Sequence, residues 1–449
     1  MRSAVSAPDT GNASRLSFML RALRYRNYRL FFIGQLISLV GSWMMQIAMT
    51  WLVYRLTGSS LLLGIVGFAG QIPAFLMGPV AGVLVDRWQR HRILVVTQVL
   101  AMLQSFALAF LALTGTITVA HIIVLSVFQG LINAFDMPAR QSFVFEIVEN
   151  KEDMGNAIAL NSSMFNIARL LGPSIGGLLI AAVGEGWCFL IDAISYIAVI
   201  ASLLLMRVPP VEKKAERAHP LQALREGFAY TVGFPPIRTI LLLMASLSLV
   251  GMPYAVLMPV MASKVLQGGP NTLGFLMAAS GMGALAAALS LAARKSILGL
   301  GRVIPLCAGA FGVGIVAFSQ STVLWLSIPI MFGMGFAMMK QMAASNTILQ
   351  TIVEDDKRGR VMSFYTMSFM GMAPFGSLWA GALADRIGAP NTLLISGFGC
   401  IAAALWFGSR LPALRESVRP IYIKMGIIPE IAVGIESAAE LSRPPEEQG

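Results

Sequence analysis

A short basic stretch follows the second long apolar run of the chain and carries its densest group of charges. Residues 78–92 read GPVAGVLVDRWQRHR, so an apolar run ends at Asp86 and three arginines follow it closely: Arg87, Arg90 and Arg92. A carboxylate and fixed cations are costly inside hydrocarbon, which places this stretch at a membrane surface. Gly82 thins the helix just before it, so that a neighbouring helix can approach closely. The stretch is either an ordinary basic loop or a charged contact between helices.

Four ionisable side chains lie inside or at the ends of apolar runs: Asp136, Arg169, Asp192 and Lys340. Such residues are rare in membrane helices, where they pair with one another or serve a transport pathway. Arg169 is either a structural cation satisfied by neighbouring helices or an anchor for an anionic or catecholate substrate. Asp192 is either structural, hydrogen-bonded to Ser195 or another neighbour, or a proton carrier.

Composition defines the class of protein. The 449 residues are 56% hydrophobic and 12% charged, and the mean hydropathy is +0.73. A soluble globular chain of this length does not carry so few charges, so a polytopic membrane protein is predicted. The three cysteines lie in or beside apolar runs and imply no disulfide framework, and the three histidines do not cluster. No metal site and no cofactor are expected.

The apolar runs are long enough for helices that cross about 30 Å of hydrocarbon, which takes roughly 20 residues. We predict an all-α protein with twelve transmembrane helices, at residues 30–54, 61–85, 93–113, 121–139, 157–183, 187–206, 237–261, 273–293, 303–318, 323–345, 361–383 and 391–409.

Lys and Arg are distributed unequally between the two sides of this topology. The N-terminal segment, the even-numbered loops and the C-terminal tail hold 28 of the 33, whereas the opposite loops hold only Arg55, Lys264 and Arg386. The positive-inside rule then puts both termini in the cytoplasm. The net charge of +11 is explained without nucleic acid as a partner.

The polar segment in the middle of the chain divides the runs six and six. The expected organisation is a cytoplasmic N-terminal segment, a six-helix half, a cytoplasmic linker, a second six-helix half and a cytoplasmic tail, at residues 1–29, 30–206, 207–236, 237–411 and 412–449.

The two halves also look related by duplication. Four pairs of glycines and one pair of arginines are separated by the same 204 residues: Gly155 and Gly359, Gly172 and Gly376, Gly177 and Gly381, Gly184 and Gly388, and Arg90 and Arg294. Two parallel pseudo-symmetric halves are the usual build of a rocking transporter. Asp136 and Lys340 share this separation, so we expect them at similar depth and facing each other.

The pattern Gly82-x-x-x-Asp86-Arg87-x-x-Arg90 resembles the signature loop of the major facilitator superfamily, with Gln89 where glycine is usual. The segments FDMPARQSF at the end of the fourth run and ARLLGPSIGG in the fifth are similar to those of the enterobactin exporter and macrolide efflux branch. The resemblance spans roughly residues 20–411. It implies the major facilitator fold, and an antiporter-like motif in the fifth run that packs against the eighth across the two halves.

The resemblance also suggests site residues. A gating group is expected at Gly82, Asp86, Arg87, Arg90, Asp136 and Arg140, and the antiporter-like motif at Arg169, Gly172, Pro173, Gly176 and Gly177. Cavity candidates are Gln35, Gln46, Gln129, Asn133, Lys340 and Gln341, and the carboxyl groups that could carry a proton are Asp136 and Asp192.

The gate itself allows two pairings. Asp136 meets either Arg90, which the resemblance favours, or Lys340, and either pair would form only while the cytoplasmic mouth is shut. In that state Asp86 should lie at the start of the eleventh run near Arg360, where helix amides attract an anion.

The function is predicted from the absence of enzyme motifs in the sequence and from the resemblance to exporters. The sequence has no Gly-Lys pair for a Walker motif and no nucleophile elbow, so an enzyme is not expected. The resemblance implies a secondary exporter, with the proton as coupling ion, that moves a siderophore, drug or similar small molecule across the bacterial inner membrane as a monomer in membrane lipid. Alternatives are a lysophospholipid or other lipid translocator on the same fold, and a non-transporting membrane sensor.

Overall fold

The computed structural model describes residues 20–148, 150–208, 220–294 and 296–428, and this part of the chain is helical, with no β-strand. Two short 3₁₀ helices belong to the first bundle: η1 (Arg21–Arg24) precedes its first long helix, and η2 (Lys151–Asp153) lies between its fourth and fifth long helices. The long helices of that bundle are α2 (Arg26–Thr57), α3 (Ser60–Arg87), α4 (Arg90–Leu113), α5 (Val119–Ile147), α6 (Met154–Val183) and α7 (Glu185–Leu205).

The second bundle is preceded by α8 (Pro220–Gly233), which lies in the segment predicted to be a linker. Its first spanning element is interrupted: α9 (Pro235–Ser246) passes through the π-helical turn η3 (Leu247–Gly251) to α10 (Tyr254–Val260) and η4 (Met261–Val265). The remaining helices are α11 (Pro270–Ala292), α12 (Leu300–Gln320), α13 (Leu324–Ile352), α14 (Asp355–Met370), α15 (Ala373–Ile387) and α16 (Ala389–Lys424).

The predicted all-α membrane fold is confirmed. Ten helical runs in the described part of the chain are long and apolar enough to cross a membrane, and each coincides with a predicted run. The other two predicted runs coincide with α13, which carries the polar pair Lys340 and Gln341, and with α14 and α15, which a turn at Gly371 separates. The total of twelve spanning helices therefore remains a prediction. At the C-terminus, α16 continues past the expected boundary at residue 411.

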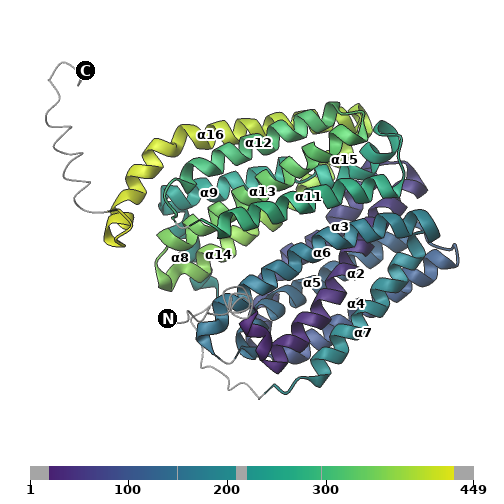
Figure 1. Ribbon diagram of the computed structural model, residues 1–449, viewed down its shortest axis with the longest axis horizontal. Helices are drawn as coiled ribbons and strands as arrows, with labels where there is room; N and C mark the ends of the chain where they lie inside the picture. Colours follow the sequence, from purple (N-terminus) through teal and green to yellow (C-terminus); the bar gives the residue numbers. More distant parts are fainter. Residues whose placement is uncertain (1–19, 149, 209–219, 295, 429–449) are drawn as a thin grey trace, which may run out of the picture.

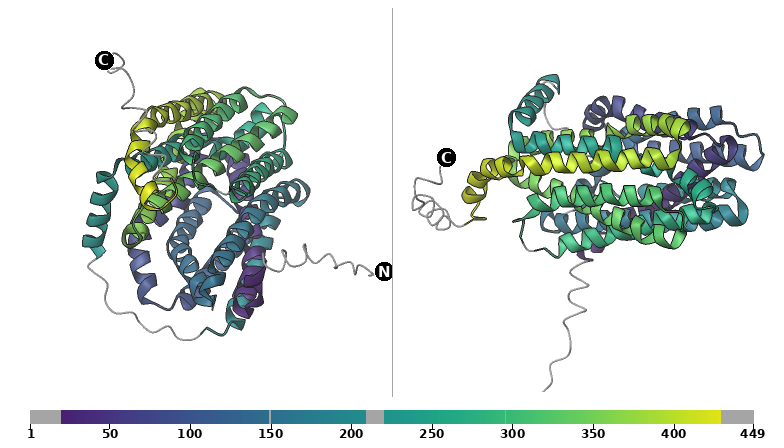
Figure 2. Two further views of the ribbon diagram at one scale, coloured as in Figure 1. Left: turned by 60° about the vertical axis from the view of Figure 1, so that its left-hand side comes forward. Right: turned by 90° about the horizontal axis from the view of Figure 1, so that it is seen from above.

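The helices form two bundles, α2 to α7 and α9 to α16, which appear in Figure 1 as a purple-to-teal group and a green-to-yellow group. Two helix pairs join them: α6 packs along α11, and α3 packs along α15. Figure 2 shows the same long helices running nearly parallel. The expected packing of the fifth run against the eighth is therefore confirmed.

Close contacts between the bundles lie at the end of the molecule away from the described termini. There the N-cap residue of α3, Ser59, donates a hydrogen bond to Asp385 of α15 at 3.2 Å, and the ammonium group of Lys264 lies 6.0 Å from the ring centroid of Tyr54. Nearer the other end, a Cβ added to Gly78 or Gly82 of α3 would meet no atom within 4 Å. Close contacts thus join the bundles at one end, and Gly78 and Gly82 of α3 face open space towards the other.

Candidate functional site

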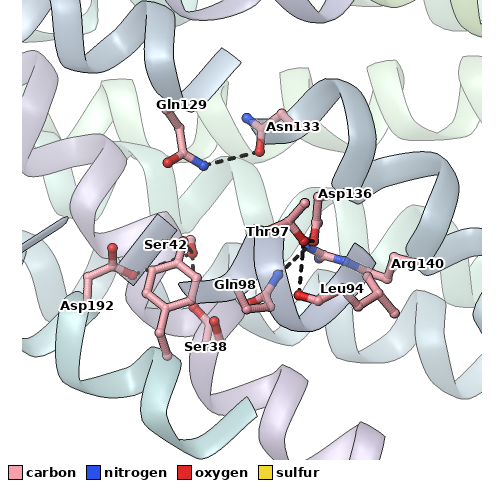
Figure 3. Close-up of polar contacts among 11 residues, drawn as sticks. Ser38, Ser42, Leu94, Thr97, Gln98, Gln129, Asn133, Asp136, Arg140 and Asp192 are labelled. Carbon is pink, nitrogen blue, oxygen red and sulfur yellow. Dashed lines mark hydrogen bonds and ion pairs between the residues drawn. The ribbon is translucent and has the colours of Figure 1, made fainter. Parts of the chain in front are cut away.

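Asp136 is the centre of a buried polar cluster between α4 and α5 (Figure 3). Its side chain is 2% exposed and forms an ion pair with Arg140, one turn further along α5. Thr97 and Gln98 of α4 donate hydrogen bonds to the same carboxylate oxygen, at 2.9 and 2.7 Å. The cluster neutralises a carboxylate inside the first bundle and fixes α5 against α4.

Neither of the gate pairs expected for Asp136 is present. Arg90, at the first turn of α4, forms an ion pair with Glu146 near the end of α5. The ammonium group of Lys340 lies 4.9 Å from the ring centroid of Phe336, on its own helix. In this conformation, residues of α4 and α5 satisfy the charge of Asp136. Because either gate pair was expected only while the cytoplasmic mouth is shut, the pairing remains a prediction for that state.

The other half of the predicted gate cannot be placed. Asp86 is the penultimate residue of α3, but its side chain lies outside the described part of the structure. Arg87 next to it is exposed, as a residue at a basic membrane surface would be. The contact expected between Asp86 and the start of the eleventh run near Arg360, which lies within α14, remains a prediction for the state with a closed cytoplasmic mouth.

Asp192 of α7 is fully buried between three helices of the first bundle. Its carboxyl group accepts hydrogen bonds from Ser105 of α4 at 2.6 Å and from Ser42 of α2 at 3.5 Å. Tyr196, one turn away, lies 3.3 Å from the same Ser42 hydroxyl. Ser195 does contact Asp192, but its hydroxyl donates to the backbone carbonyl at 2.7 Å. In the described part of the chain, Asp192 forms no ion pair with a cation.

The antiporter-like motif supplies two smooth faces of α6. A Cβ on Gly172 would lie 2.4 Å from Cβ of Trp43, and one on Gly176 would lie 3.0 Å from Met44, both on α2. On the neighbouring face, a Cβ on Gly177 would lie 2.8 Å from Cα of Gly274 on α11. The glycines therefore hold α6 against a helix of its own bundle and against a helix of the other bundle at once.

Arg169 lies on α6 between these two contacts. Its guanidinium carbon is 6.0 Å from the ring centroid of Trp43, and its backbone carbonyl oxygen would lie 3.2 Å from a Cβ on Gly281 of α11. The side chain is half-buried, and no carboxylate in the described part of the structure pairs with it. Phe165, one turn earlier on α6, is 45% exposed and packs edge-on to Trp43 with centroids 5.6 Å apart. A cation and two aromatic rings thus gather where α2, α6 and α11 meet.

The glutamine and asparagine side chains predicted to line the cavity differ in how far they are buried. Gln46 is exposed on α2, whereas Gln35 on the same helix is 3% exposed. Gln129 donates to Asn133 on α5 at 3.2 Å, and the carbonyl oxygen of Gln129 is buried without a partner in the described structure. Gln341 is fully buried and its amide nitrogen contacts Ser345 and the sulfur of Met244. Gln341 therefore joins α13 to α9, and the half-buried Gln129 and Asn133 are better placed to meet a ligand.

A second polar cluster lies outside the spanning segments, where η1 meets the start of α6. Asp153 is 3% exposed and receives contacts from Arg21 at 2.9 Å and from Arg24 and the Tyr25 hydroxyl at 2.6 Å each. The hydrogen bond from Tyr25, followed by the positive charges of Arg24 and Arg21, holds the pKa of Asp153 below its ordinary value, although burial opposes this. The cluster fastens the N-terminal end of α2 to that of α6.

Several partners were not identified from the sequence. Thr97, Gln98, Ser105 and Ser42 are polar residues in apolar runs, a signal that was available, but only the fold shows which carboxyl group each one meets. Glu146 gave no such signal, because it lies seven residues beyond the end of the predicted run 121–139.

With this geometry established, the chain can be assigned to a family. Residues 18–424 match the major facilitator superfamily model described as transmembrane secretion effector. The chain belongs to this family, as its signature-like loop and helical fold indicated. It is therefore a transporter and not an enzyme, and a multi-pass protein of the bacterial inner membrane.

Three curated relatives are similar over most of their length. The staphyloferrin A transporter of Staphylococcus aureus is 29% identical, over 86% of this chain and 97% of the relative. The multidrug efflux pump Tap of Mycolicibacterium fortuitum is 26% identical, over 82% and 92%. Macrolide efflux protein A of Streptococcus pyogenes is 24% identical, over 85% and 96%.

Solved structures agree on the fold. A bacterial homologue of the human lysosomal transporter Spinster, inward-facing and unoccupied, has a TM-score of 0.69 at 15% identity and covers 88% of this chain and 98% of its own. The nucleoside transporter NupG has a TM-score of 0.67 at 15% identity, with 86% and 98% covered. These similarities concern the fold alone.

Proposed function

We propose that this protein exports a small anionic molecule of the siderophore class, and that Arg169 binds the anionic group of that substrate. The observation that carries the proposal is the half-buried guanidinium at the junction of α2, α6 and α11, which no described carboxylate neutralises. A cation at this depth requires an anion, carbonyl groups or water. An exporter of cationic drugs would instead be expected to place an acidic side chain there.

One of the three relatives supports this class of substrate. One of them is named for the siderophore staphyloferrin A, and two others for multidrug or macrolide efflux. The rings of Trp43 and Phe165 beside Arg169 offer an apolar surface for the remainder of such a molecule. The cation of Arg169 and the two aromatic rings thus lie in one site. An apolar drug could bind to the rings without contacting the guanidinium.

Export requires a defined orientation and two conformations. We place both termini in the cytoplasm on the basis of the Lys and Arg distribution, and the end of α3 that carries Gly78 and Gly82 then faces the cytoplasm. Reporter fusions test this orientation: a fusion after residue 225 should be cytoplasmic, and one at Thr116 external. Two fusions on the same side would contradict it.

Asp192 is our candidate for the site that couples transport to the proton gradient. It is buried with only hydroxyl groups as side-chain partners, whereas Arg140 compensates the charge of Asp136. A buried carboxylate without a cation is costly, so Asp192 can bind a proton in one conformation and release it in another. Asp192→Asn should abolish proton-driven export and leave substrate exchange without a gradient intact. Loss of both activities would mean that Asp192 is structural.

Inside-out membrane vesicles test the main proposal. Vesicles that contain the full chain should accumulate staphyloferrin A when energised, Arg169→Gln should reduce accumulation to background, and Arg169→Lys should restore part of it. Arg238→Gln, an exposed arginine at the start of α9, is the matched control and should match the wild type. Unchanged accumulation by Arg169→Gln, at equal protein levels in the membrane, would refute the proposal.

A further inference from the structure

The last helix extends well beyond a membrane span. α16 has 36 residues, whereas about 20 residues cross the hydrocarbon. The extension beyond residue 409 reads RLPALRESVRPIYIK, and Figure 2 shows this yellow segment reaching past the neighbouring helices. Its apolar residues recur on one face, at Leu411, Leu414, Val418 and Tyr422, and Leu414 and Val418 are buried. The extension is therefore amphipathic and packs along the second bundle.

A cavity of about 530 Å³ lies under this extension, within the range of roughly 300–1,000 Å³ typical of pockets for small ligands. Apolar side chains from four helices line its inner part, namely Ile240 of α9, Ile304 of α12, Ile348 of α13, and Phe407 and Leu411 of α16. The cavity belongs to the second bundle alone and is separate from the junction at Arg169.

The charged residues of the lining are mostly cations. Arg302 comes from the first turn of α12, and Arg415 and Arg419 come from the extension of α16, against the single carboxylate of Glu416. Arg302 and Arg415 are exposed, and within the described part of the structure neither guanidinium takes part in an ion pair or hydrogen bond. The N-terminus of α12, with the positive end of its dipole, adds to the same field.

We propose that this cavity binds an anionic phospholipid, with one acyl chain between the apolar side chains and the headgroup phosphate at Arg302 and Arg415. The arrangement matches the acyl chain and the headgroup of such a lipid, since an apolar interior opens to cations beside the part of α16 that extends beyond the length of a membrane span. Basic pockets between transmembrane helices on the cytoplasmic side are suited to anionic headgroups. The bound lipid would hold the extension of α16 against α9 and α12.

Thermal unfolding of the full chain in detergent tests the site, with dioleoyl phosphatidylglycerol or dioleoyl phosphatidylcholine added. The two lipids share their acyl chains and differ in headgroup charge. Phosphatidylglycerol should raise the melting temperature at lower concentration than phosphatidylcholine. In Arg302→Gln/Arg415→Gln its apparent affinity should fall about 30-fold, which corresponds to about 1 kcal/mol for each cation. Arg302→Lys/Arg415→Lys should retain most of the preference.

The matched control is Arg26→Gln/Arg207→Gln, which removes two exposed arginines from the first bundle and should keep the phosphatidylglycerol preference. Equal stabilisation by the two lipids, or a preference that survives in Arg302→Gln/Arg415→Gln, would overturn the proposal.

Discussion

Gly177 of α6 and Gly274 of α11 lie backbone against backbone across the two bundles, and Gly381 of α15 and Gly64 of α3 form the equivalent contact. A Cβ on Gly177 would lie 2.8 Å from Cα of Gly274, and one on Gly381 would lie 2.8 Å from Cα of Gly64. Gly177 and Gly381 are separated by 204 residues. The shared separation thus marks two equivalent junctions at which the bundles are joined.

These junctions predict the effect of a single methyl group. Gly64→Ala and Gly177→Ala should each destabilise the observed conformation by about 1–3 kcal/mol, because the methyl group overpacks a contact between backbones. Thermal unfolding of the purified protein measures this, and labelling of a cysteine at Ser59 should become faster as the junction opens. Gly78→Ala is the matched control on α3, since its Cβ would meet no atom within 4 Å. If Gly64→Ala left the melting temperature unchanged, as Gly78→Ala should, the junction would tolerate a side chain.

The ion pair of Asp136 with Arg140 predicts that removal of the cation costs more stability than removal of the carboxylate. Arg140→Gln should destabilise the protein by about 3–5 kcal/mol, because it leaves a buried carboxylate uncompensated. Asp136→Asn should cost less, since an amide carbonyl can still accept from Thr97 and Gln98. The double variant Asp136→Asn/Arg140→Gln should recover most of the stability lost in Arg140→Gln. If thermal unfolding shows no recovery, the two residues act independently.

The fold was predictable from the sequence to a greater extent than the contacts of the site. Apolar runs of sufficient length fixed the positions of the helices, because the hydrocarbon permits few alternatives. α13 was the hardest helix to recognise as a membrane span from hydropathy, because the polar residues Lys340 and Gln341 lie within it. The intramembrane charges Asp136, Arg169 and Asp192 were recognisable by their rarity. Their partners were not, because the choice between Arg90, Lys340 and Arg140 depends on helix rotation and on which helices are adjacent.

The cluster at Asp153 predicts a dependence on acid. The pKa of this carboxyl group is lowered in the folded protein, whereas an unfolded Asp has a pKa of about 3.9. The stabilisation is therefore fully present above about pH 4, and it is lost as the pH falls through the lowered pKa of the folded state. The protection factors of residues 21–30, which correct amide exchange for its intrinsic dependence on pH, should fall over this acid range in the wild type. In Asp153→Asn protection should be low throughout, and Glu416→Gln, which changes an exposed carboxyl group, should behave as the wild type. Protection that does not change with acid in the wild type would contradict this role.

The central claim is that Arg169 binds the anionic group of the exported molecule, and titration calorimetry with staphyloferrin A tests it most directly. Loss of a hydrogen bond to a charged group is worth about 1.5–3 kcal/mol, so Arg169→Gln should bind staphyloferrin A about 10- to 150-fold more weakly than the wild type. Binding of a macrolide to the rings of Trp43 and Phe165 should be unchanged in the same variant. Equal affinity of the wild type and Arg169→Gln for staphyloferrin A would contradict the account.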